Sequence, residues 1–267
     1  ANTAPAFYKN QIVTIHDLAF FNKKWVSQKF RLFYKILIPQ IIKNSLKIVT
    51  VSEFSKKEII KHFKVSPDKI EVVYNAVSTE FNELVKNDFQ NNYGEYILAV
   101  SSLNPRKNFE NLIKAFSKLK LKDINLIIVG TEAVIYKNSN IKDILKENSN
   151  IIFTDYISDN ELVGLYKNAK LFVFPSFYEG FGVPPLEAMS CGCPTVVSGS
   201  ASIPEVCADA SYYIDPNDIN SIAGGIYEVL KDKTLQTELR TKGFERLKNF
   251  SWESSAQKYS KIIRELL

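Results

Sequence analysis

Short apolar runs rich in β-branched residues alternate along the chain with longer amphipathic stretches. The runs predict buried strands, and the stretches, whose apolar residues recur every three or four positions, predict helices. Strands that alternate with helices indicate βαβ units and a parallel sheet. In the first part of the chain this pattern predicts strands at 11–15, 47–51 and 70–74, and helices at 27–44 and 55–63, the second one capped by Ser52.

A polar, asparagine-rich stretch at 78–93 interrupts this pattern and predicts a linker. The pattern then resumes with six strands, expected at 96–101, 125–130, 151–154, 171–175, 194–198 and 211–214. Helices are expected between and after them, at 109–119, 141–147, 159–168, 185–190, 203–206, 219–230, 235–248 and 252–267. Six strands suffice for a doubly wound domain, whereas three strands make only half of one.

This difference between the two halves sets the expected domain organisation. A sheet that ended at residues 11–15 would have an unpaired edge, so we expect about 100 residues to precede residue 1. The prediction is a partial domain with its linker at 1–88, a complete domain at 89–250 and a terminal helix at 251–267.

Composition narrows the class of protein. The chain has 267 residues, of which 45% are hydrophobic and 24% charged, as in a globular protein with an ordinary core. No run approaches the ~18–20 apolar residues that span a bilayer, and residues 1–20 do not have the pattern of a secretory signal. Three cysteines and two histidines argue against a disulfide framework and a zinc site, and free thiols fit a reducing cytosol. The net charge of +5 comes from scattered lysines, which argues against nucleic-acid binding.

The most informative stretch is residues 177–198, FYEGFGVPPLEAMSCGCPTVVS. It follows an apolar strand and therefore lies at a carboxyl end, where open α/β sheets bind ligands. Gly180 and Gly182 permit close backbone approach, and free amides at the start of the following helix suit a diphosphate. Glu179 and Glu187 are expected to face one cleft, one reaching a sugar hydroxyl and the other a ribose. The alternative is two solvated glutamates beside a turn.

This stretch resembles the Glu-x7-Glu signature of family 4 retaining glycosyltransferases with the GT-B fold. The resemblance covers nearly the whole chain and implies two Rossmann-like, doubly wound α/β domains that face each other across a cleft, here with the first one incomplete. It also implies that Glu179 is catalytic and orients the donor sugar, that Glu187 binds the ribose, and that Gly180, Phe181 and Gly182 contact the donor diphosphate. The terminal helix resembles the one that crosses back onto the first domain.

Two further segments carry the same resemblance. Residues 99–113, AVSSLNPRKNFENLI, resemble the turn in which a lysine holds the donor diphosphate. Lys107 matches that lysine and Arg106 lies beside it, and two cations before a helix suit a diphosphate. The alternative is a solvated Arg-Lys turn. Residues 14–20, TIHDLAF, resemble the motif whose histidine points across the cleft at the donor sugar. His16 is therefore the second expected catalytic residue, although a histidine after a strand also has a structural interpretation, and Asp17 either orients it or caps the following turn.

The resemblance also implies the reaction. A hexose would move from a nucleotide-diphosphate sugar to a hydroxyl of a glycan or lipid-linked acceptor in cell-surface polysaccharide synthesis, with retention and with neither cofactor nor metal. The sequence contains no Asp-x-Asp, in line with transfer that needs no metal. Relatives contact the nucleotide base mainly by backbone, at positions that match Gly130, Tyr156 and Ile157. The motif variants resemble the O-antigen mannosyltransferase branch, so GDP-mannose is the expected donor, with UDP- and dTDP-hexoses as alternatives.

Two other functions remain to be weighed. A fragment that binds the nucleotide sugar without turnover is the main alternative, because the expected first half of the N-terminal domain precedes this chain. A nucleotide-dependent dehydrogenase is disfavoured, because no Gly-x-Gly-x-x-Gly follows a strand.

The helix expected at 27–44 has basic and apolar residues interspersed. It is either a membrane-contacting helix at the inner face of a cytoplasmic membrane or a core-facing helix with solvated lysines, the interpretation that we favour. The apolar members are Phe30, Phe33, Tyr34, Ile36 and Ile41, and the basic ones are Lys29, Arg31, Lys35 and Lys43.

Overall fold

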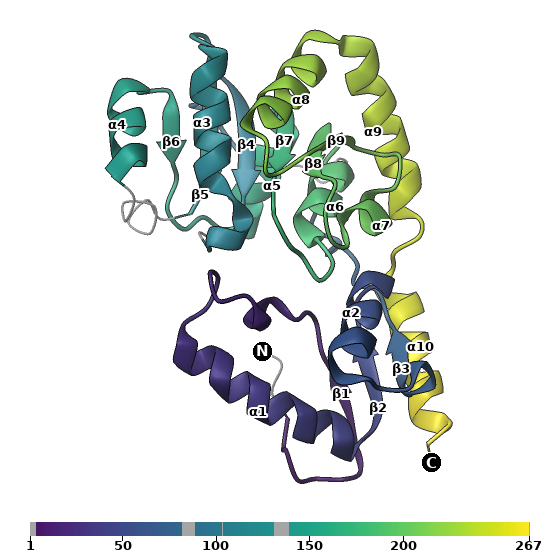
Figure 1. Cartoon of the computed structure of the whole chain (residues 1–267). Helices are drawn as coiled ribbons and strands as arrows, with labels where there is room; N and C mark the ends of the chain where they lie inside the picture. Colours follow the sequence, from purple (N-terminus) through teal and green to yellow (C-terminus); the bar gives the residue numbers. More distant parts are fainter. Residues whose placement is uncertain (1–3, 82–88, 103, 131–138, 267) are drawn as a thin grey trace.

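The structure, a computed structural model, describes residues 4–81, 89–102, 104–130 and 139–266. It contains two parallel sheets (Figure 1). The smaller sheet has the order β1-β2-β3 and consists of β1 (Gln11–Thr14), β2 (Ser45–Thr50) and β3 (Ile70–Val72). Two helices connect its strands, α1 (Gln28–Asn44) and α2 (Glu53–Phe63), together with short 3-10 turns at Ala19–Phe21 and Pro67–Lys69.

Helices cover both faces of this small sheet. Alternate side chains of β2 point to opposite faces and pack against different helices. Ile48 packs with Ile38 of α1 and Ile59 of α2. Val49 packs on the other face with Ile262 of α10 (Trp252–Arg264). The terminal helix thus packs against the sheet formed by the first part of the chain, on the side opposite α1 (Figure 1).

The larger sheet has the order β6-β5-β4-β7-β8-β9 with all strands parallel. The strands are β4 (Glu95–Val100), β5 (Ile124–Val129), β6 (Ile151–Phe153), β7 (Leu171–Phe174), β8 (Thr195–Ser198) and β9 (Tyr212–Ile214). The helices are α3 (Phe109–Leu119), α4 (Ser139–Glu147), α5 (Asp159–Asn168), α6 (Val183–Ser190), α7 (Ile203–Cys207), α8 (Ile219–Lys231) and α9 (Lys233–Leu247).

These helices cover both faces of the larger sheet, so its strands are buried on both sides and are almost continuously apolar. On β4, Ile97 belongs to the core beneath α3 and α8, and Leu98 to the core beneath α5 and α6. The α/β fold with parallel sheets expected from the sequence is confirmed.

The predicted elements agree closely with the observed ones. Each expected strand and helix is present, with ends shifted by a few residues. Ser52 is the N-cap of α2 as expected, and its Oγ accepts a hydrogen bond from the Ser55 N–H at 3.0 Å. Of the expected linker, residues 82–88 lie outside the described residues, so the boundary at 88 remains a prediction. The three cysteines are free and buried.

Helix α1 is core-facing only in part. Tyr34 and Ile41 are buried against the small sheet, as the favoured interpretation of this helix expects. Phe30, Phe33 and Ile36 are 46%, 55% and 64% exposed, so the core-facing interpretation is wrong for these three residues.

Candidate functional site

The loops after β4 and β7 meet at the point where the order of strands reverses. From β4 the chain adds β5 and β6 on one side, whereas β7 leads to β8 and β9 on the other. Ligands of open α/β sheets bind at such a switch point, beyond the carboxyl ends of the strands. The two loops are hydrogen-bonded to each other, from the Phe177 N–H to the Arg106 carbonyl at 2.8 Å and from Asn108 Nδ2 to the Pro175 carbonyl at 3.0 Å.

Three charged side chains join these loops. Glu179 accepts from Arg106 Nη1 through Oε2 and from Lys107 Nζ through Oε1, each at 2.7 Å. Lys107 is 7% exposed and Glu179 6% exposed, so the interpretations of a solvated Arg-Lys turn and a solvated glutamate are both wrong. Ser176 Oγ donates to Glu179 Oε1 at 2.5 Å, and the Lys107 amine lies 5.1 Å from the centroid of the Phe174 ring. The cluster thus holds two cations against one carboxylate.

The surroundings weaken the hold of Lys107 on its proton. Burial lowers the pKa of Lys107 below its usual value, and the nearby Glu179 carboxylate opposes this effect. A buried cation is stabilised by opposite charge, so an anionic ligand with several oxygens would be well accommodated here.

Gly180 brings the site loop into direct contact with the first part of the chain. A Cβ at this position would lie 2.3 Å from the His16 carbonyl oxygen and 2.8 Å from Asp17 Cβ, so only glycine fits. The Gly180 carbonyl accepts hydrogen bonds from Ser52 Oγ at 2.6 Å and Ser55 Oγ at 3.1 Å. These contacts hold the His16 segment against the loop that carries Glu179.

The start of α6 offers fewer amides than expected. Gly182 caps this helix with φ of 107°, and a Cβ there would lie 2.5 Å from Ile203 Cδ1. Pro184 and Pro185 follow, and because proline has no N–H, only two of the first four helical residues can donate. The free amides expected at the start of this helix are therefore limited to those of Val183 and Leu186. Phe181 is 3% exposed and packs in the core, and its carbonyl accepts a hydrogen bond from Ser202 Oγ at 2.8 Å.

Glu187 lies one turn into α6 in different surroundings from Glu179. The Tyr166 hydroxyl of α5 donates to Glu187 Oε2 at 3.0 Å. Burial raises the pKa of Glu187 to about 7, and the hydrogen bond from Tyr166 opposes this rise. The carboxyl group therefore changes its charge close to neutral pH. No sequence motif marks Tyr166 as a site residue, because it lies on an ordinary amphipathic helix.

His16 follows β1, and partial burial lowers its pKa below the usual value, so its ring is neutral at neutral pH. Asp17 Oδ1 accepts from the Ala19 N–H at 2.9 Å and thus caps the turn, one of the two roles considered for it. The next residue, Leu18, donates its N–H to the Tyr178 hydroxyl at 3.2 Å, a second link to the site loop.

A pocket of about 360 Å³ lies beside His16, between the small sheet and α10. Its wall includes Tyr74, Trp252 and Tyr259. Trp252 is 51% exposed. A hydrogen bond of 2.7 Å between Thr14 Oγ1 and the Tyr259 hydroxyl fixes the helix across the pocket. The aromatic rings and the polar His16 suit a sugar ring.

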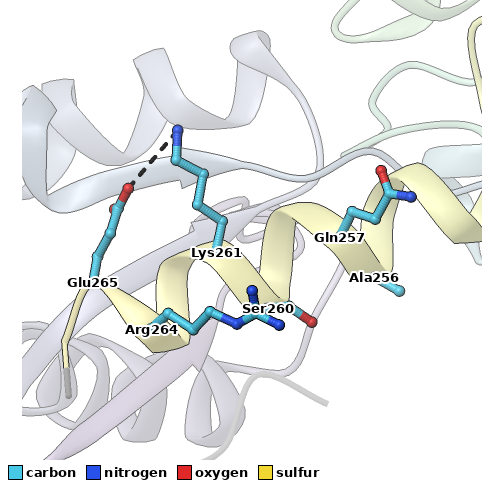
Figure 2. A pocket seen from close by; sticks show the side chains of 6 residues that line it. All are labelled: Ala256, Gln257, Ser260, Lys261, Arg264 and Glu265. Carbon is cyan, nitrogen blue, oxygen red and sulfur yellow. Dashed lines mark ion pairs between the residues drawn. The ribbon is translucent and has the colours of Figure 1, made fainter.

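A second hollow, of about 490 Å³, lies along α10 alone (Figure 2). It contains none of the residues predicted for the site. Its lining residues are Ala256, Gln257, Ser260, Lys261, Arg264 and Glu265.

The residues predicted to contact the base lie after β5 and β6. Gly130 has φ of 141° and forms an isolated bridge with Asp155, which ties the ends of the two strands together. Ile157 is partly buried, whereas Tyr156 is 94% exposed and its ring is turned to solvent. Residues 131–138 of this region lie outside the described residues.

Comparison with known proteins decides the family. The model of the Glycosyl transferases group 1 family matches residues 81–246, more than half of the chain, and that of Glycosyltransferase Family 4 matches residues 4–81. The chain belongs to the glycosyl transferases of group 1. The resemblance to GT-B enzymes of family 4 is thus confirmed, and with it the class of enzyme, a glycosyltransferase.

Two relatives of this glycosyltransferase are O-antigen chain mannosyltransferases of bacteria. O-antigen chain mannosyltransferase B of Escherichia coli is 32% identical over 269 residues, covering 94% of this chain and 70% of the relative. O-antigen chain mannosyltransferase RfbU of Salmonella typhimurium is 33% identical over 226 residues, covering 83% of this chain. The chain spans 61% of the length of that relative.

A solved structure gives the same fold. Anabaena Alr3699/HepE in complex with UDP-glucose matches this glycosyltransferase with a TM-score of 0.79, at 16% identity, over 95% of this chain and 72% of that one. Within the described part of the glycosyltransferase, no group of three or more His, Cys, Asp and Glu side chains is arranged to hold a metal ion. None of the described helices is both long and apolar enough to cross a membrane.

Proposed function

We propose that this glycosyltransferase moves a mannosyl group from GDP-mannose to a hydroxyl of a glycan or lipid-linked acceptor, with retention of configuration, in the synthesis of a cell-surface polysaccharide. Both relatives named above are O-antigen mannosyltransferases. The observation that carries the proposal is the cluster of Arg106, Lys107 and Glu179 at the switch point of the larger sheet. The reaction takes place in the cytoplasm, because three free cysteines suit a reducing compartment.

Lys107 and Arg106 bind the donor diphosphate and stabilise the charge that develops on it as the sugar leaves. Cations fixed in a buried site are already oriented for this charge, which makes them effective in catalysis. The diphosphate replaces the Glu179 carboxylate as the partner of Arg106 and Lys107. Glu179 then accepts a hydrogen bond from a hydroxyl of the donor sugar. The backbone of Gly180, Phe181 and Gly182 runs beside the diphosphate.

Glu187 accepts hydrogen bonds from the ribose hydroxyls. Its ionised form suits this role best, because an ionised carboxylate acts only as an acceptor. Tyr166 favours that form, because its hydroxyl donates to the carboxylate. The base lies over the ends of β5 and β6, at Gly130, Tyr156 and Ile157. No cofactor or metal takes part.

His16 holds the donor sugar from the side of the small sheet. Its neutral ring donates or accepts a hydrogen bond with a sugar hydroxyl. The adjoining pocket, with Tyr74, Trp252 and Tyr259 in its wall, receives the next sugar ring.

The test is transfer of mannose to octyl α-mannoside with GDP-mannose or UDP-glucose as donor. We expect mannosylated product from GDP-mannose and none from UDP-glucose, and a Glu179→Gln variant without product. Equal transfer from UDP-glucose would contradict the proposed donor.

A second candidate is a fragment that binds the donor without turnover. It is supported by the share of the Salmonella relative that the chain spans, 61% of its length. In that case GDP binds, no product forms, and a version extended at its N-terminus by the corresponding part of the E. coli relative forms product.

A further inference from the structure

Helix α2 begins where the small sheet meets the site loop, and the amides of its first turn need acceptors. The first N–H groups of an α-helix have no partner within the helix itself. Ser52 Oγ satisfies one of them, the N–H of Ser55, at 3.0 Å. A single hydroxyl does not reach the whole turn, so the N–H groups of Glu53 and Phe54 require acceptors from elsewhere.

Glu205 supplies these acceptors from the larger sheet. Its Oε1 accepts from the Glu53 N–H at 2.7 Å, and its Oε2 accepts from the Phe54 N–H at 2.9 Å. Glu205 lies on α7, 152 residues from Glu53, and α7 and α2 meet where the two parts of the chain adjoin (Figure 1). The Tyr74 hydroxyl, just after β3, forms a hydrogen bond with the same carboxylate. One carboxylate beside the larger sheet thus binds three groups of the first part of the chain, and its negative charge suits the start of a helix.

The main chain around Glu205 is also held in place. Arg246 of α9 donates from Nε to the Val206 carbonyl at 2.8 Å and from Nη2 to the Glu205 carbonyl at 2.5 Å. The Arg246 guanidinium lies 4.9 Å from the centroid of the Phe250 ring. Because α9 fixes its backbone, Glu205 has few positions to lose when its carboxylate binds α2, which favours the contact.

The turn of α2 that Glu205 holds also contacts the segment of His16. Ser55 Oγ lies 3.2 Å from the His16 carbonyl oxygen and 3.1 Å from the Gly180 carbonyl oxygen, and both accept from it. Gly180 directly follows Glu179. The start of α2 therefore joins the backbone of His16 to the loop of Glu179, and Glu205 fixes the start of α2.

We propose that Glu205 is a positioning residue that holds the start of α2, and through it His16, against the loop that carries Glu179. Glu205 acts through the helix and not by contact with the donor. Its effect on ligands rests on the proposed function, in which His16 holds the donor sugar. Glu205 then contributes to the binding of the mannosyl group of GDP-mannose and not to the binding of GDP.

The first test is amide hydrogen exchange of the chain without ligand, followed by NMR, which does not depend on the proposed function. Glu205→Gln keeps the size of the side chain but removes its charge and one acceptor oxygen. We expect the amides of Glu53, Phe54 and Leu18 to exchange about tenfold faster, the size of effect that follows loss of a helix cap. The Leu18 amide donates to the Tyr178 hydroxyl at 3.2 Å and therefore reports whether the His16 segment stays on the site loop.

The second test is calorimetric titration with GDP and with GDP-mannose. Glu205→Gln should bind GDP like the unchanged chain, which also shows that the donor site is folded. It should bind GDP-mannose about fivefold more weakly, the size expected for one hydrogen bond to the sugar, and so should His16→Ala. Because Glu205 acts through His16, the double variant should bind GDP-mannose no more weakly than His16→Ala does. The matched control is Asp209→Asn, which changes an exposed carboxylate near Glu205 that pairs with Lys242 and should alter neither exchange nor affinity.

Unchanged exchange of the Leu18 amide in Glu205→Gln would overturn the proposal, because the His16 segment would then be held without Glu205. Losses of GDP-mannose affinity that add up in the double variant would overturn it as well, because Glu205 would then act independently of His16. Failure of the unchanged chain to bind GDP would contradict the proposed donor instead, and the exchange of Leu18 would still decide the role of Glu205.

Discussion

Replacing Glu187 by glutamine should stabilise the protein at alkaline pH while weakening its binding of donor. Burial raises the pKa of Glu187 to about 7, from an ordinary value of 4.5. The folded protein therefore holds this proton more tightly than the unfolded chain does. The resulting contribution of Glu187 to the free energy of unfolding is fully present below pH 4.5 and is lost as the pH rises through about 7.

The pKa difference sets the size of the effect. A rise from 4.5 to about 7 corresponds to a loss of up to about 3 kcal/mol in the free energy of unfolding once the carboxyl group is ionised. The Glu187→Gln side chain does not ionise, and its carbonyl can still accept from the Tyr166 hydroxyl. The variant should thus gain up to about 3 kcal/mol over the unchanged chain at pH 8.5, relative to their difference at pH 4.5.

The assay is urea unfolding of both proteins at several values between pH 4.5 and 8.5. The difference between their free energies of unfolding isolates Glu187, because the other titrating groups are common to both. A Tyr166→Phe variant should lose further stability at pH 8.5, because the carboxylate then lacks the hydrogen bond that opposes the rise in the pKa of Glu187. The matched control is Glu238→Gln, which changes an exposed carboxylate on α9. A difference between the two free energies of unfolding that stays constant with pH would contradict the raised pKa of Glu187.

Two further substitutions test the surroundings of the site loop. Glu179→Gln leaves the buried Lys107 without its carboxylate and should lower the free energy of unfolding in urea by about 3 kcal/mol. Added GDP should restore part of this loss. An unchanged free energy of unfolding would contradict the buried ion pair. Gly180→Ala should cost at least about 2 kcal/mol, because its Cβ would meet the His16 carbonyl oxygen at 2.3 Å. Gly199→Ala, where the nearest atom lies at 3.7 Å, serves as its control, and equal unfolding midpoints for the two alanine variants would contradict the close approach.

The periodicity of apolar residues was sufficient to predict the strands, the helices and the α/β class of the fold. Each strand of the larger sheet is a compact apolar run, and the motif residues follow β4 and β7 as predicted. Which loops meet could not be predicted from the sequence, because the residues in contact are far apart along the chain. Arg106 and Glu179 are 73 residues apart, and only the order of the strands brings them together.

Contacts made by ordinary residues were also beyond the sequence. Ser52 was predicted as a helix cap, but its second role, donating to the Gly180 carbonyl 128 residues away, depends on how the two sheets meet. Periodicity marked Phe33 and Ile36 as apolar and could not tell whether a partner covers them. The structure shows that they are exposed.

The most direct test of the donor site is calorimetric titration of the chain with GDP, UDP and dTDP. We expect GDP to bind most tightly and Lys107→Ala to weaken its binding at least about tenfold. Lys114→Ala, which removes a surface ion pair on α3, should leave GDP binding unchanged. Undiminished GDP binding by Lys107→Ala would contradict the site, and tighter binding of UDP or dTDP would contradict the donor.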